Sequence, residues 1–121
     1  MIIDNKAKKG LARQGDVVME KWTAGIPKDA RKMVPKHGRI VFALGEVTGH
    51  QHSTKFNPDT MEAWETDEYM FLTSKAPFEV THDEHDTIPS DAIGHVAGEI
   101  FTARVYIQKE YQAGEIKKVL D

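Results

Sequence analysis

Glycine and proline divide this chain into short segments of strand length, and no long helical pattern interrupts them. The clearest segment is 100–108, in which apolar side chains alternate with more polar ones from Phe101 to Gln108. Its apolar positions are Phe101, Ala103, Val105 and Ile107. A period of two is typical of a strand with one buried face. This segment therefore predicts a sheet as the basic unit of the fold.

Several other segments have the length and composition of strands. We expect strands at 16–22, 39–44, 68–73 and 78–82, with 39–44 buried on both faces. The segment 29–34 predicts one helical turn that ends before Pro35. The acidic segments 57–68 and 83–91 predict exposed loops, the first of them a loop or a strand edge.

Composition agrees with a sheet, because Ile and Val number 18 against 4 Leu. The expected fold is therefore mainly β: a single-domain antiparallel β-sandwich, jelly roll or small barrel. With 121 residues the chain has room for one domain, which we place at 14–121, after a mobile basic arm at 1–13.

Charge is divided unequally along the chain. Residues 1–39 carry ten Lys or Arg against four Asp or Glu, whereas 40–121 carry six against fifteen. Such polarity favours contacts between subunits, and it predicts a homo-oligomer or docking to another protein such as a capsid. A pI near 6.1 argues against nucleic acid as the main partner.

The sequence excludes sites that depend on cysteine and a membrane-spanning helix. Cysteine is absent, so a metal site cannot use thiolate ligands and catalysis cannot use a cysteine nucleophile. No apolar run reaches the eighteen or so residues that a membrane-spanning helix needs. We expect a cytoplasmic protein, with a virion component as the alternative.

Four of the six histidines form two close pairs. His50 and His52 are two residues apart and share a face if the chain is extended there. His82 and His85 occupy a point where a strand runs out into a loop. Together the four imidazoles predict a site for a divalent transition metal: Zn²⁺, Fe²⁺, Mn²⁺ or Ni²⁺.

Two acids accompany these pairs, either as hydrogen-bond partners that orient the metal ligands or as a general base, namely Glu46 and Glu84. The alternative is a purely structural role, because a histidine beside an acid in a hydrophilic loop often makes only a local hydrogen bond. His82 shares a face with Phe78 and Val80 and would then be a core histidine, and no cofactor would be bound. His37 and His95 stand alone, and a structural role is favoured for both.

A basic connection between the first two strands predicts an interaction surface for phosphate or for an acidic protein. Its candidate residues are Lys28, Arg31, Lys32 and Lys36. A solvated face is the alternative. No phosphate-binding loop, serine nucleophile motif or Ca²⁺-loop spacing is present, so no reaction is predicted.

Four motifs in order resemble a family of small uncharacterised proteins of bacteria and their phages. They are Ala12-Arg13-Gln14-Gly15-Asp16-Val17-Val18, Gly45-Glu46-Val47-Thr48-Gly49-His50-Gln51-His52, His82-Asp83-Glu84-His85 and Gln108-Lys109-Glu110-Tyr111. The resemblance implies no activity. A looser one is to cupins, in Gly45, His50 and His52, but the glutamate expected soon after is missing.

Two functions therefore compete. The first is a small phage or bacterial β-barrel protein that binds a divalent metal and has no known activity, which rests on the named histidines. The second is a phage virion component, such as a capsid-decorating protein, which rests on the charge division and on the resemblance.

Overall fold

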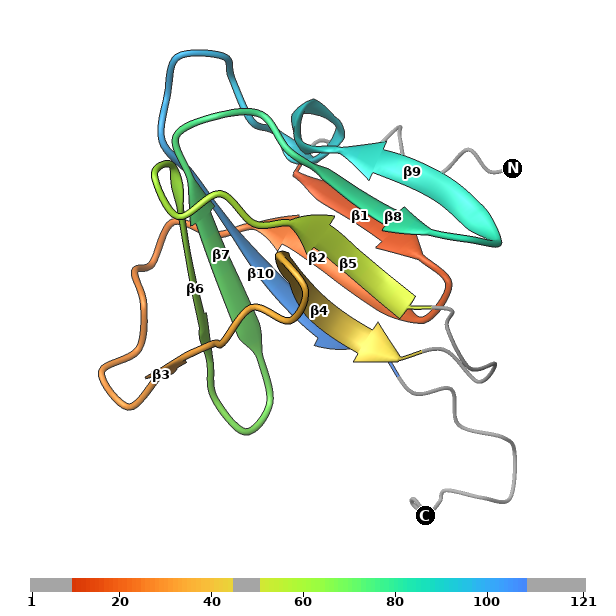
Figure 1. Ribbon diagram of the computed structural model, residues 1–121. Coiled ribbons are helices and arrows are strands. Elements are labelled where there is room, and N and C mark those ends of the chain that lie inside the picture. The colour runs from red at the N-terminus through yellow and green to blue at the C-terminus, as the bar shows by residue number, and fades with distance from the viewer. Residues whose placement is uncertain (1–9, 45–50, 109–121) are drawn as a thin grey trace.

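A computed structural model describes residues 10–44 and 51–108, which form a mainly β structure of two antiparallel sheets (Figure 1). Within these ranges the elements are β1 (Leu11–Gln14), β2 (Val17–Lys21), β3 (Arg31–Lys32), β4 (Arg39–Leu44), β5 (Gln51–Lys55), β6 (Met61–Glu65), β7 (Met70–Ser74), β8 (Glu79–His82), β9 (His85–Pro89), the 3₁₀-helix η1 (Ser90–Ile93) and β10 (Phe101–Ile107).

The two sheets face each other as in a sandwich. One has the strand order β1-β2-β10-β7-β6-β3, and the other has the order β4-β5-β8-β9. Apolar side chains from both sheets form one core, whose largest fully buried members include Met19, Ile40, Leu72 and Ile93. The expected antiparallel β-sandwich is confirmed, and the described strands do not close into a barrel.

β10 shows why the alternating pattern is a good guide. It lies between β2 and β7, with its ends set by the pairs Ile107 with Val17 and Phe101 with Ser74. Its first three apolar positions are buried, whereas Ile107 is 43% exposed at the end of the strand. The pattern therefore predicts the inward face correctly until the strand runs beyond the core.

One edge of the sandwich is closed by a side chain. β1 and β9 are the outer strands of their sheets and lie against each other there. Gln14 of β1 is buried, and its Nε2 donates to the backbone oxygens of Val80 and Asp86, at 3.1 and 2.8 Å. Its amide therefore supplies hydrogen bonds across the gap between the two sheets.

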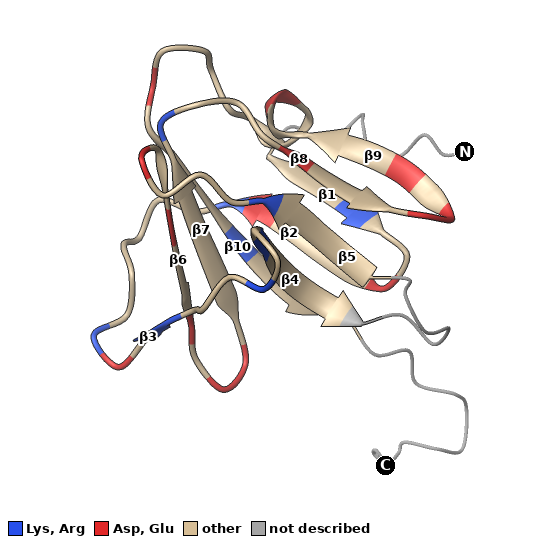
Figure 2. Cartoon of the chain, in the orientation of Figure 1, with Lys and Arg blue, Asp and Glu red and all other residues tan. Residues whose placement is uncertain are grey.

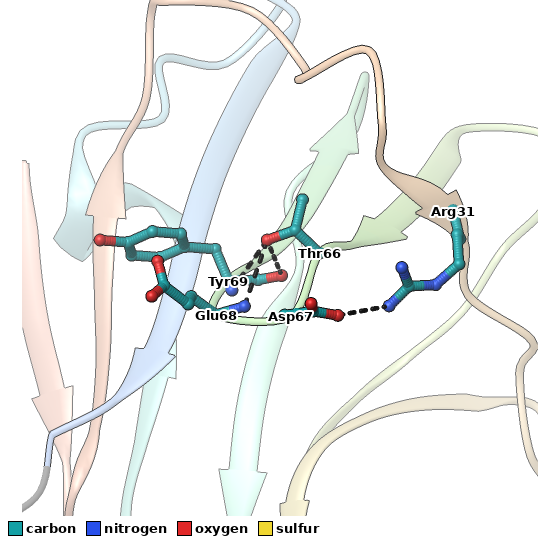
Figure 3. A network of polar contacts seen from close by, with 5 residues as sticks. All are labelled: Arg31, Thr66, Asp67, Glu68 and Tyr69. Atoms are coloured by element: carbon teal, nitrogen blue, oxygen red, sulfur yellow. Dashed lines mark hydrogen bonds and ion pairs between the residues drawn. The ribbon is translucent and has the colours of Figure 1, made fainter.

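At the opposite edge the outer strands are β3 and β4. β3 has only two residues, which pair with Glu65 and Trp64 of β6. The turn after β6 is held by Thr66, whose Oγ1 accepts bonds from the backbone N–H groups of Glu68 and Tyr69 (Figure 3). Arg31 reaches Asp67 of this turn at 3.5 Å and so ties β3 to it.

Two local expectations at this edge are wrong. The segment 29–34 contains the two-residue β3 instead of a helical turn, because pairing of Arg31 and Lys32 with β6 holds the backbone extended there. β4 has the expected bounds but is not buried on both faces. It is the outer strand of its sheet, and Val41 and Ala43 are only half-buried.

The two acidic segments also contain strands. β6 lies between β7 and β3, with Met61 and Ala63 buried and Glu62 pointing to solvent. β9 forms a hairpin with β8, and Ile88 is the one buried residue of β9. Glu62 and Asp86 are exposed although they lie within strands, so acidity alone was a poor sign of a loop.

The expected arm lies mostly outside the described residues, since residues 1–9 are not described. Its last part differs from the expectation, because Leu11–Gln14 forms β1 and pairs with β2. Ala12 is buried there, which explains why this stretch is held in the sheet. Among the described residues, no helix has the length and apolar character that crossing a membrane would require.

Candidate metal-binding site

Three histidines from three adjacent strands meet at the closed edge of the sandwich. His52 lies on β5, His82 ends β8 and His85 begins β9, and these strands are neighbours in one sheet (Figure 1). The ring centroids of His52 and His82 are 4.3 Å apart, those of His82 and His85 4.6 Å, and those of His52 and His85 5.8 Å. The two sequence pairs thus contribute to one cluster.

The tautomer of His52 follows from its partner. Gln14 Nε2 donates to two carbonyl oxygens, which fixes the orientation of this amide and leaves its Oε1 as an acceptor. His52 Nδ1 lies 2.8 Å from that oxygen, so Nδ1 carries the hydrogen and donates it. The lone pair of neutral His52 is therefore on Nε2, the form in which histidine binds a metal.

The environment of His52 also keeps it neutral. The pKa of His52 is lowered from 6.5 to about 4. Burial is the largest cause, and the charge of His82 is the second. The carboxylate of Asp16 acts in the opposite direction, and His85 lowers the pKa further. At neutral pH the His52 lone pair is therefore available, without a proton to displace.

His82 and His85 are less buried than His52. The side chain of His52 is buried, that of His82 is half-buried and that of His85 is exposed, so the cluster runs from the interior to the surface. His82 Nδ1 accepts a hydrogen bond from the backbone N–H of Glu84 at 3.0 Å. This local bond agrees with the structural alternative for His82 and competes with metal binding through Nδ1.

Gly15 forms the wall of the cluster on the β1–β2 side. A Cβ atom at Gly15 would lie 2.9 Å from His85 Nε2 and 3.4 Å from His52 Cε1. Its φ of +59° is also unfavourable for other residues. The tight turn and the close approach of the two rings therefore both require glycine.

The spacing of the rings suits a metal ion, but their present orientation does not. In a tetrahedral site with metal–nitrogen bonds of about 2.1 Å, neighbouring ring centroids are about 5 Å apart. The three rings are near that spacing but are partly stacked, with His52 and His85 only 16° from parallel. Accordingly, the described residues contain no group of three or more His, Asp or Glu side chains already placed to hold an ion.

Of the other residues predicted for this site, two cannot be placed. His50 and Glu46 lie outside the described residues. Glu84 is near the cluster through its backbone N–H, which contacts His82.

The predicted basic surface is spread along the β2–β4 connection. Lys28 is exposed in a turn, and Arg31 and Lys32 form β3. Lys32 Nζ lies 3.9 Å from Glu62 and 5.8 Å from the ring centroid of Trp64. Lys36 lies beyond β3 and lines a cavity beside β4. The four side chains therefore do not converge on one point.

Sequence reasoning missed Gln14 and Gly15. Both lie in the turn region between two short strands, about 40 residues from His52 and about 70 from His85 in the chain. Nothing in their local sequence indicates that β1 closes the sandwich against β9. Only the topology reveals these two residues as parts of the site.

His95 has the bonding of a structural histidine. It is buried, its Nδ1 lies 3.0 Å from Ser90 Oγ, and its Nε2 lies 2.9 Å from the backbone oxygen of Glu99. Its ring stacks on Phe101 with centroids 5.0 Å apart. Both ring nitrogens are thus engaged in holding η1 and the following loop against the core.

In a comparison with family models, residues 13–92 match a family described as Domain of unknown function (DUF8820). The matched range includes Gln14, Gly15 and the three clustered histidines. No curated protein and no solved structure matches the chain.

Proposed function

The chain belongs to the DUF8820 family, whose description assigns no activity, and from its histidine cluster we propose that it binds a divalent transition metal. His52, His82 and His85 would be the ligands, and water would complete a tetrahedral shell. The observation that carries the proposal is the meeting of three imidazoles at centroid distances of 4.3 to 5.8 Å.

The hydrogen bond to Gln14 supports this proposal independently. Histidine ligands usually donate their second ring N–H to an oxygen, which fixes the tautomer and makes the ligand nitrogen more basic. His52 already has this arrangement, because its Nδ1 donates to Gln14 Oε1. His52 would thus be the fixed ligand, around which the other two histidines adjust.

The donor set narrows the choice of metal. Three imidazoles without thiolate suit Zn²⁺, Fe²⁺ or Ni²⁺, whereas Mn²⁺ favours carboxylate and water ligands. Two changes must accompany binding: the rings of His82 and His85 turn their edges toward the ion, and His82 binds through Nε2 with a protonated Nδ1. The second change breaks the hydrogen bond that Glu84 N–H now makes.

The test is a titration of metal-free protein with Zn²⁺ and with Co²⁺, followed by calorimetry and by the visible absorption of Co²⁺. We expect one ion per chain and a Co²⁺ spectrum typical of four-coordinate nitrogen ligation. His52→Ala and His85→Ala should each weaken binding by at least about tenfold. In a ¹⁵N-resolved spectrum, the amide of Glu84 should shift and exchange faster when Zn²⁺ binds.

His37→Asn is the matched control, because His37 is exposed and has a φ of +52°, which Asn tolerates. This variant should bind the metal as the wild type does. The proposal is wrong if the wild type retains far less than one ion per chain and melts at the same temperature with and without Zn²⁺. Equal affinity in the wild type and in His52→Ala would contradict it as well.

A second candidate function is contact between protein subunits, as in a phage virion. Two apolar side chains of the η1–β10 loop favour it: Val96 is 55% exposed and Ile100 is 67% exposed. Sedimentation at low and high salt tests this candidate. An assembly that Val96→Ser and Ile100→Ser weaken would support it, and a monomer at all concentrations and salt levels would rule out self-association.

A further inference from the structure

The outer edge of β4 borders a cavity of about 480 Å³ that both sheets help to line. Met33 and Val34, which follow β3, face the cavity on one side, and Val41, Phe42 and Ala43 of β4 line it on the other. Val34 is 77% exposed at the rim. The cavity therefore offers an apolar surface directly beside an outer strand.

The backbone of β4 turns hydrogen-bonding groups toward this edge. Gly38 accepts a bond from Phe56 N–H at 2.9 Å, on the side of β5. Arg39 exchanges bonds of 3.0 and 2.8 Å with Lys36, on the opposite side. Because these directions alternate along an antiparallel strand, the N–H and C=O of Val41 also point away from β5.

The two edges of the sandwich differ in how far their backbone groups are hydrogen-bonded. At the closed edge, Gln14 donates to backbone oxygens of β8 and β9. At the β4 edge, among residues 10–44 and 51–108, the Lys36–Arg39 bridge engages only the start of the strand, and the register shifts between Val41 and Ala43. A short stretch around Val41 is thus left as a template for an added strand.

The charge around this edge indicates what kind of strand would fit. The connection that leads into β4 carries Lys28, Arg31, Lys32 and Lys36 against the single acid Asp29, and β4 itself begins with Arg39 (Figure 2). Within the described ranges Lys36 makes no ion pair, and Glu65 is the one carboxylate that lines the cavity. A partner with negative charge is therefore complementary to this edge.

We propose that β4 binds an extended acidic segment of a partner protein, which adds to the sheet as a strand at Val41 and places an apolar side chain in the cavity. Main-chain hydrogen bonds would supply affinity, as in other cases of strand addition. The cavity and Lys36 would select an apolar residue flanked by acids.

The test uses a fluorescent synthetic peptide of alternating acid and valine, acetyl-Asp-Val-Glu-Val-Asp-Val-Glu-amide, and fluorescence polarisation. We expect saturable binding that weakens at least about tenfold when alternate amides of the peptide are N-methylated. The same loss is expected when every acid of the peptide is replaced by lysine. Hydrogen exchange should show that the Val41 amide becomes protected when the unmodified peptide binds.

Protein variants give a second, independent readout. Lys36→Glu should weaken binding at least about tenfold, whereas Lys75→Glu, an exposed change away from the cavity, should not. Val41→Pro should abolish binding, because it removes the outward N–H that would donate to the peptide. The variant should still fold, since proline is tolerated at a sheet edge. If this variant fails to fold, the N-methylated peptide still tests the same hydrogen bonds.

Three results would overturn the proposal. They are no binding of the unmodified peptide at millimolar concentration, equal binding of the N-methylated peptide, and no effect of Lys36→Glu. Concentration-dependent dimerisation through β4, with no peptide binding, would instead assign this edge to a second copy of the chain.

Discussion

Gln14 and His52 are joined by a buried hydrogen bond of 2.8 Å between Oε1 and Nδ1, and this bond connects the two sheets of the sandwich. Gln14 is on β1 of one sheet and His52 is on β5 of the other. Because the amide of Gln14 also donates to Val80 and Asp86, all three of its bonds cross the gap. One side chain therefore serves both the fold and the proposed ligand.

Replacing Gln14 with leucine should affect both roles. Gln14→Leu keeps an apolar body of similar size but leaves two backbone oxygens and His52 Nδ1 without their partner. We expect the free energy of unfolding to fall by about 1–3 kcal/mol, as for other buried groups that lose a hydrogen bond. Urea denaturation of metal-free protein measures this loss.

The same variant tests the coupling to the metal. If Gln14 fixes the tautomer of His52, Gln14→Leu should weaken Zn²⁺ binding by about 10- to 100-fold. The comparison is made by calorimetry in conditions where the variant is folded. An unchanged affinity would show that His52 does not depend on Gln14 for its ligand geometry.

Stability of the metal-free protein should decrease on mild acidification because of His52. Its pKa is about 4 in the folded state and near 6.5 in the unfolded chain. Between these values the unfolded chain takes up a proton that the folded state does not, so stability is lost as pH falls from 6.5 to 4. The expected loss from this group is on the order of 3 kcal/mol.

The measurement is a series of urea denaturations with chelator present between pH 7.5 and pH 4. His52→Asn should flatten the pH dependence, since the amide of asparagine can donate to Gln14 but does not titrate. His37→Asn should keep the wild-type slope. Equal slopes in His52→Asn and the wild type would assign the pH dependence to other groups.

The strands could be predicted where one face is buried and the pattern is local. β10 and β2 are examples, because alternation or apolar character marks them without any knowledge of their neighbours. β6 and β9 could not be predicted in this way, since exposed acids within the strands, such as Glu62 and Asp86, obscure the few buried positions. Their strand character is decided by pairing with β7 and β8, which is a property of the topology.

The site could be predicted only in part for the same reason. The sequence predicted that the pairs His50/His52 and His82/His85 share one site, and the structure places the rings of His52, His82 and His85 within 5.8 Å of one another, with His50 outside the described residues. The sequence contains no sign of Gln14 or Gly15 as neighbours of these rings. The partial stacking of the imidazoles depends on side-chain packing, which no spacing rule describes.

Gly15→Ala should disturb the cluster more than its backbone conformation alone explains. The new Cβ would lie 2.9 Å from His85 Nε2, so the ring must move. Gly25→Ala is the matched control, because its φ is +90° and nothing lies within 4 Å of its Cβ position. Both variants should lose about 1 kcal/mol of stability from the positive φ.

Only Gly15→Ala should also weaken Zn²⁺ binding and shift the side-chain resonances of His52 and His85. Calorimetry and a histidine-selective NMR spectrum compare the two variants. If both variants bind Zn²⁺ equally well, the close approach of Gly15 to the rings has no part in the site.

Arg104 should be the most important charged residue for stability on the outer face of the six-stranded sheet. Its Nε donates to Glu20 Oε2 at 2.6 Å, and its Nη2 forms an ion pair with the same oxygen. Its guanidinium lies 4.1 Å from the ring centroids of both Trp22 and Tyr69. Lysine cannot reproduce this planar contact, so Arg104→Lys should cost about 1–2 kcal/mol.

The exposed pair of Arg31 and Asp67 provides the comparison (Figure 3). Their side chains are 60% and 94% exposed, against 21% and 24% for Arg104 and Glu20. Because solvent screens an exposed pair, Arg31→Lys should change the free energy of unfolding by less than about 0.5 kcal/mol. Urea denaturation measures the loss in the free energy of unfolding for Arg104→Lys and Arg31→Lys. Equal losses in the two variants would mean that burial and aromatic contact add nothing to the Arg104 ion pair.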